Sequence, residues 1–128
     1  MEASSGRTGR METVNRVLRT LQSESPDVTA AALLSDDGLI IASALPQNLE
    51  EARVGGMSAT LLALGTRAAS ELGIGTPQQV LVRANGGFAV LATASPGTVL
   101  LVLTTENARL GLLFLDMARA VREIAKVL

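Results

Sequence analysis

The chain has 128 residues, a formal net charge of -1, no histidine and no cysteine. Without these two residue types it offers no thiolate chemistry, no common zinc site and no histidine-based acid–base mechanism, and we expect neither an enzyme nor a cofactor. An aromatic content of 2% and a balanced charge argue against a surface that binds nucleic acid. The sequence has no long apolar run, which argues against a signal peptide or a membrane span. We therefore expect a cytoplasmic protein.

The N-terminal segment divides into a polar start and a helix. Residues 1–10, MEASSGRTGR, are small and polar, which predicts a disordered leader or an expression remnant, with a single domain over residues 11–128. From Met11 onward the apolar residues follow helical spacing at Val14, Val17, Leu18 and Leu21. Ser25-Pro26 ends this short amphipathic helix, because proline cannot continue the hydrogen-bond ladder.

Two strands follow, over residues 28–34 and 39–43, joined by Ser35-Asp36-Asp37-Gly38. Asp-Gly supplies the backbone angles of a tight turn, so we expect a β-hairpin. Asp36 and Asp37 could also form a catalytic or metal-binding carboxylate pair. The turn interpretation is favoured, because no third ligand or general acid is near them in the sequence.

Residues 49–72 are predicted to form one long helix, with Asn48 as its N-cap and Gly73 as its C-terminal stop signal. A large stripe of apolar residues follows helical spacing, at Val54, Met57, Leu61, Leu64, Ala68 and Leu72. A neighbouring small stripe consists of Gly55, Ala59, Leu62, Thr66 and Ala69. Small residues let two backbones approach closely, so we expect one stripe to pack on a sheet and the small stripe to meet a partner helix. The alternative is a helix buried on both sides within its own fold.

Three strands and a helix complete the chain, over residues 78–84, 87–93, 98–104 and 106–128. Asn85-Gly86 predicts a second hairpin, and the polar residues of the first of these strands suit a sheet edge that is open to another chain. The predicted fold is α+β in the order α-β-β-α-β-β-β-α. We expect a five-stranded antiparallel sheet with the long middle helix on one face and the terminal helices on the other.

The pattern resembles the Roadblock/LC7 family, whose fold is profilin-like. The residues that carry the resemblance are the hairpin from Ser35 to Ser43, the segment MSATLLALGTRAASELG from Met57 to Gly73, and the stretch from Asn107 to Leu113. The chain is most similar to the stand-alone prokaryotic members, which are described as regulators of Ras-like GTPases.

The resemblance implies a non-catalytic homodimeric adaptor that binds a small Ras-like GTPase and modulates or localises it. In such a dimer the strands over residues 78–84 pair and the middle helices pack together. The expected interface residues are the small stripe together with Val80, Leu81 and Val82, and the candidate partner contacts are Arg53, Thr60, Arg67 and Glu71. Arg53 or Arg67 could act as an arginine finger, although solvent-exposed roles are favoured. The alternatives are a small-ligand sensory domain, or a scaffold subunit that pairs with a related chain.

Overall fold

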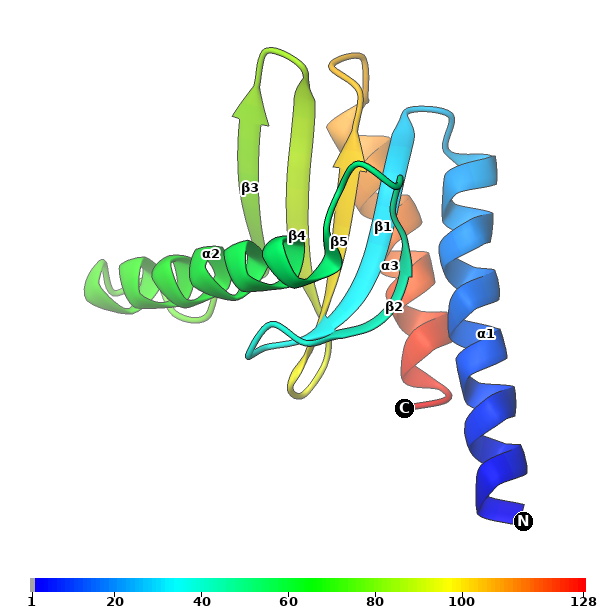
Figure 1. Ribbon diagram of the computed structural model, residues 1–128. Helices are drawn as coiled ribbons and strands as arrows, with labels where there is room; N and C mark the ends of the chain where they lie inside the picture. The colour runs from blue at the N-terminus through cyan, green and yellow to red at the C-terminus, as the bar shows by residue number, and fades with distance from the viewer. Residues whose placement is uncertain (1) are drawn as a thin grey trace.

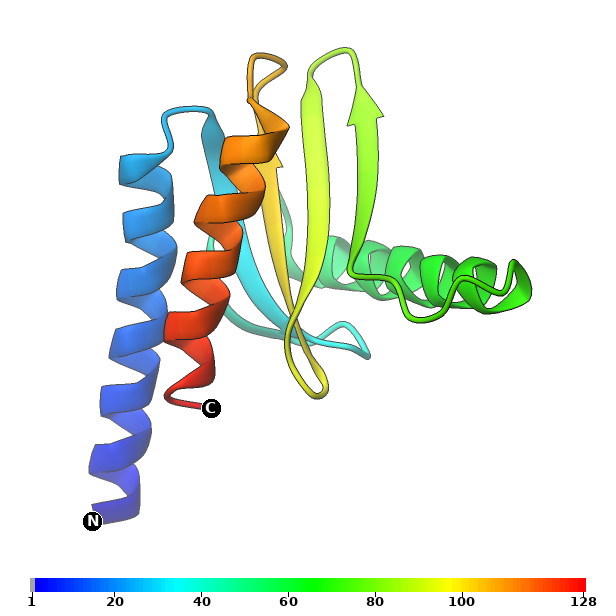
Figure 2. The same cartoon turned by 180° about the vertical axis from the view of Figure 1, so that it is seen from behind.

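The computed structural model describes residues 2–128, and their side chains from Gly9 onward. The elements are α1 (Glu2–Glu24), β1 (Val28–Ser35), β2 (Ile40–Ala44), α2 (Glu51–Glu71), β3 (Gln79–Ala84), β4 (Gly87–Ser95), β5 (Thr98–Thr104) and α3 (Leu110–Ala125). The strands form one antiparallel sheet in the order β2-β1-β5-β4-β3. Helix α2 covers one face of this sheet, and α1 and α3 cover the other (Figures 1 and 2). The predicted α+β fold and order of elements are confirmed.

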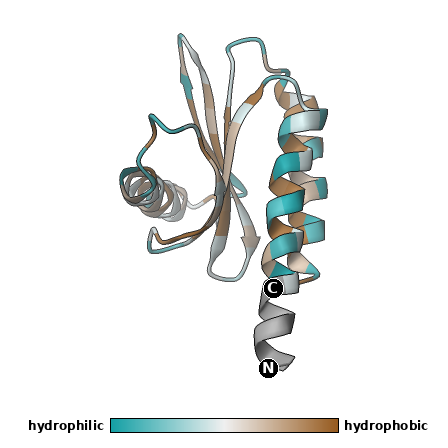
Figure 3. Cartoon of the chain, turned by 45° about the vertical axis from the view of Figure 1, so that its right-hand side comes forward, coloured by the Kyte–Doolittle hydropathy of each residue, from teal (hydrophilic) through white to brown (hydrophobic). Residues whose placement is uncertain are grey.

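The sheet separates two hydrophobic cores, as the edge-on view in Figure 3 shows. Alternate residues of a strand point to opposite faces, so Leu33 packs under the terminal helices and Leu34 packs under α2. The core under α1 and α3 is the larger of the two and includes Leu18, Met117 and Ile124. The central strands are therefore apolar on both faces, as their sequences predicted.

Both predicted hairpin turns are present. Gly38 has a φ of 96°, which an Asp-Gly turn readily supplies. Ser35 donates its hydroxyl hydrogen bond to Asp37 across this turn, and the backbone N–H of Asp36 donates to the carbonyl of Gly97 at 3.0 Å. The pairing of Ala84 with Gly87 closes the second hairpin around Asn85 and Gly86. Asp36 and Asp37 are thus turn residues.

The helix ends differ from the prediction at several points. The N-cap of α2 is Glu50, which makes no side-chain capping hydrogen bond, and Asn48 lies in the turn before it. Helix α3 spans Leu110–Ala125 rather than residues 106–128. At its N-terminal side, Thr105 ties the preceding loop to Asp27, the residue before β1. Its backbone N–H donates to the Asp27 carbonyl, and its hydroxyl donates to the Asp27 carboxylate, both at 2.8 Å.

Helix α1 begins at Glu2, before the predicted start at Met11. The segment that was expected to be a leader continues the helical ladder, and Thr13 donates its hydroxyl hydrogen bond to the carbonyl of Gly9 at 3.0 Å. Gly9 and Arg10 are exposed. Among the side chains that the structure describes, Met11 is the first to pack against the core. A domain boundary at Met11 stays a prediction.

Deleting residues 2–10 tests that boundary. We expect the free energy of unfolding to change by less than about 0.5 kcal/mol, because small polar residues contribute little to a hydrophobic core and Gly9 and Arg10 are exposed. Urea unfolding followed by circular dichroism measures the change. A loss of several kcal/mol would place these residues inside the folded unit.

Candidate protein interaction site

Helix α2 runs across the strands, and its C-terminal half extends beyond β3 (Figures 1 and 2). The outer part of the helix therefore has no strand of its own chain beneath it. Three large apolar side chains are exposed along α2 and its C-cap: Met57 at 55%, Leu64 at 63% and Leu72 at 72%. We call these three residues the apolar strip. They recur at helical spacing, so they lie along one side of α2.

The opposite side of α2 packs against the hairpin of its own chain. A Cβ atom added to Gly55 would lie 2.1 Å from the carbonyl oxygen of Gly38, and one added to Gly38 would lie 3.3 Å from the Cβ of Ala59. Gly55 and Ala69 are buried, and Leu62 packs partly into the core under α2. The prediction that the small stripe faces a partner is therefore wrong for Gly55 and Ala69, because their own chain covers them.

The remaining member of the small stripe, Thr66, is exposed beside Asp36. The predicted large stripe divides as well, since Val54 is buried in the core under α2 while the apolar strip is exposed. The exposed apolar surface of α2 thus lies on the side that faces away from the hairpin.

Strand β3 lies at the edge of the sheet, as its polar residues predicted. Val80 packs under α2, where a Cβ on Gly65 would lie 2.6 Å from its Cγ2 atom. Leu81 is 39% exposed and Val82 is 40% exposed. An edge strand presents unpaired backbone N–H and C=O groups. The open edge of β3 and the part of α2 that extends beyond it lie on the same side of the molecule (Figure 1).

The candidate partner contacts on α2 are all exposed: Arg53, Thr60, Arg67 and Glu71. Arg67 pairs with Glu71, with 3.0 Å between Nε and Oε1, and both side chains are mostly exposed. An exposed pair of this kind contributes at most about 1 kcal/mol to stability. These charges are therefore available to a partner.

Among the side chains that the structure describes, from Gly9 onward, no group of three or more acidic residues is placed to hold a metal ion. Within residues 2–128, no helix has the length and apolar character needed to cross a membrane.

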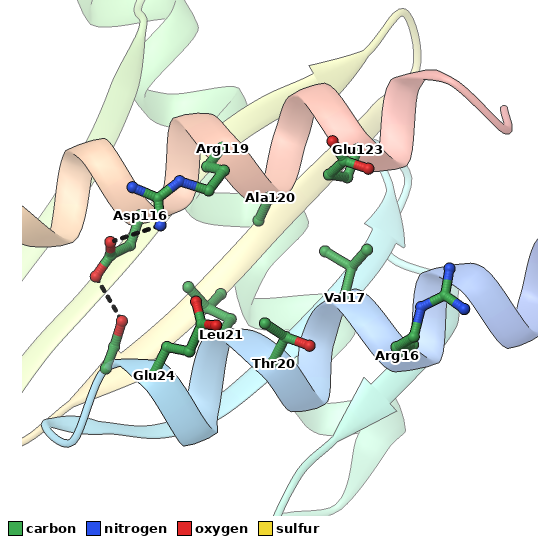
Figure 4. Close-up of a pocket in the computed structure, with 10 residues that line it drawn as sticks. Arg16, Val17, Thr20, Leu21, Glu24, Asp116, Arg119, Ala120 and Glu123 are labelled. Atoms are coloured by element: carbon green, nitrogen blue, oxygen red, sulfur yellow. Dashed lines mark hydrogen bonds and ion pairs between the residues drawn. The ribbon is translucent and has the colours of Figure 1, made fainter.

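A concave surface that no sequence pattern indicated lies between α1 and α3, on the face of the sheet opposite α2 (Figure 4). It encloses about 230 Å³. The Ser25 hydroxyl donates a hydrogen bond to Asp116 Oδ2 at 2.5 Å, which joins the two helices at one end of the concavity. Its residues are far apart in the sequence, so no local pattern could have brought them together.

A family model described as the Roadblock/LC7 domain matches residues 14–104. An uncharacterised protein of Methanocaldococcus jannaschii is 32% identical over 111 residues, which cover 87% of this chain and 96% of that protein.

Several solved structures have a similar fold. A Roadblock/LC7 domain from Streptomyces avermitilis is similar with a TM-score of 0.82 and 28% identity, covering 88% of this chain and 94% of that one. MglB of Myxococcus xanthus is similar with a TM-score of 0.84 and 20% identity, covering 91% of this chain and 88% of that one. A profilin of Schizosaccharomyces pombe shares the fold more distantly, with a TM-score of 0.63 and 13% identity over 88% of this chain and 97% of the profilin.

Proposed function

The chain belongs to the Roadblock/LC7 family, and we propose that it is a non-catalytic homodimeric adaptor that binds a small Ras-like GTPase. The observation that carries the proposal is the apolar strip of α2, which extends past an open sheet edge. The family supplies the class of partner, and a cytoplasmic location suits this role.

A two-fold axis beside β3 accounts for both exposed features. Antiparallel pairing of β3 with the same strand of a second copy would satisfy the backbone groups of both edges. The two α2 helices would then lie side by side through Met57, Leu64 and Leu72. Burying each large apolar side chain is worth about 1.5–3 kcal/mol. That gain is large beside a domain stability of about 5–15 kcal/mol.

The expected interface is revised accordingly. Val80, Leu81 and Val82 remain the proposed strand contacts, and the apolar strip replaces the small stripe as the helix contact. The core between α2 and the sheet is filled by aliphatic side chains, including Leu34 and Leu101. The alternative of a small-ligand sensor therefore gains no support, whereas a scaffold subunit would use the same surface.

The GTPase test uses purified Ras-like GTPases from the source organism, each loaded with GDP or with a non-hydrolysable GTP analogue. We expect one of them to bind the adaptor in one nucleotide state, as measured by calorimetry. Failure of every such GTPase to bind in either state would contradict the proposed partner.

Single variants at Arg53 and Arg67 probe the proposed GTPase-binding surface. We expect Arg53→Ala and Arg67→Ala to weaken GTPase binding by severalfold, because contacts from exposed charges at an interface rim are modest. GTP hydrolysis by the bound GTPase should stay unchanged. A loss of hydrolysis on the order of 1,000-fold would instead identify an arginine finger.

A further inference from the structure

A second cavity lies end to end with the concavity between α1 and α3. It encloses about 330 Å³, and both cavities are lined by Glu24, Ser25 and Asp116. The hydrogen bond from Ser25 to Asp116 is therefore a bridge that lies between two halves of one groove. We call this surface the terminal-helix groove.

The groove is apolar on each side of the bridge. Val17, Leu21 and Ala120 line the first half. Leu112 and Leu113 line the second half, and Leu112 is 55% exposed. Helices α1 and α3 flank the first half, whereas the second half lies between the start of α3 and residues 26–28, which follow α1. A groove with apolar surface on each side of a polar centre is the shape that an amphipathic helix fills.

Carboxylates dominate the centre of the groove. Glu24 and Asp116 place two carboxylates at the centre, and the Asp116 side chain is 28% exposed, so it can be reached from solvent. The Nη1 atom of Arg119 lies 3.8 Å from the Oδ1 atom of Asp116, so Arg119 offsets only part of the negative charge at the centre. The ends carry both signs of charge, because Glu123 and Arg16 both lie at the far end of the first half (Figure 4), and Asp27 and Arg109 both line the second half.

We propose that the terminal-helix groove docks an amphipathic helix of a partner protein that carries a central lysine or arginine. The basic side chain lies over the Ser25–Asp116 bridge. An apolar side chain three or four residues to each side enters each half of the groove, which is one helical turn away. The groove lies on the face opposite α2, so this proposal does not depend on the GTPase partner.

The probe is a phage-displayed library of 15-residue alanine-rich helical peptides, selected against the full-length protein. The central position and the positions three and four residues to each side are randomised. We expect selection to enrich lysine or arginine at the centre and leucine, isoleucine or methionine at the flanking positions. No enrichment, or enrichment of acidic residues at the centre, would overturn the proposal.

Two variants locate the binding site, using the synthesised consensus peptide and fluorescence anisotropy. Thr20 is exposed and lines the groove, so Thr20→Arg should weaken binding at least tenfold by filling the groove and repelling the basic centre. Asp116→Asn should weaken binding about tenfold, since it removes the central charge. The asparagine oxygen can still accept the Ser25 hydrogen bond, so the fold is retained.

The matched controls are Ala118→Arg on the exposed surface of α3 and Asp37→Asn on the hairpin. Neither residue lines the groove, and both variants should bind the peptide as the native protein does. Circular dichroism checks that all four variants fold. Equal affinity of native protein and Thr20→Arg would show that the peptides bind elsewhere and would overturn the proposal.

Discussion

Replacing Gly55 with alanine should lower the free energy of unfolding by about 1–3 kcal/mol, the usual cost of forcing an extra group into a packed site. The new Cβ would lie 2.1 Å from the Gly38 carbonyl oxygen and 3.1 Å from its carbonyl carbon. Both are backbone atoms of the hairpin, so the strain cannot be relieved by a side-chain rotation. Either the hairpin or the start of α2 has to move.

Gly56 is the matched control, one position further along the same helix. A Cβ there would meet nothing within 4 Å, and alanine is favoured over glycine inside a helix by roughly 0.5–1 kcal/mol. Gly56→Ala should therefore stabilise the protein while Gly55→Ala destabilises it. Urea unfolding of the two variants measures both changes. A neutral or stabilising Gly55→Ala would contradict the packing of α2 on the hairpin.

Leu64→Arg should raise the dissociation constant of the proposed homodimer by on the order of 100-fold. Each copy would lose an apolar anchor at the centre of the apolar strip and would bring an unpaired charge into the interface. Leu64 is 63% exposed in the single chain, so the fold of the protomer should be unaffected. Sedimentation equilibrium measures the dissociation constant.

Ala63→Arg is the control for this prediction. Ala63 is also exposed but lines the cleft on the hairpin side of α2, beside Asp36. The same charge placed there should leave the dissociation constant within a fewfold of the native value. If Leu64→Arg dimerised as tightly as Ala63→Arg, the apolar strip would not be the interface.

Local signals were sufficient to predict the order of elements. Asp37-Gly38 and Asn85-Gly86 each marked a tight turn, and Pro26 and Gly73 marked helix ends. These signals work because each depends on the backbone angles of one or two residues. The polar residues of β3 also predicted its edge position, since an edge strand needs less apolar surface.

The faces of α2 could not be assigned in this way. Gly55 and Ala59 correctly predicted that another backbone comes close to the helix. Their spacing did not identify the backbone that approaches the helix. In the structure it is the turn at Gly38 of the same chain. The residues left exposed are the large ones, which suits an interface in which side chains interlock.

The terminal-helix groove could not be predicted from the sequence either. Its centre depends on a hydrogen bond between Ser25 and Asp116, which lie in segments far apart along the chain. The apolar spacing of each terminal helix predicted a buried face. The depression between the two helices arises only when they pack against each other on the sheet.

The central claim is that two copies of this chain pair through α2 and β3, and the solution molar mass tests it most directly. Light scattering on a size-exclusion column should give about twice the 13.2 kDa of one chain, and this value should persist as the protein is diluted. A mass of one chain at every concentration would contradict the homodimer.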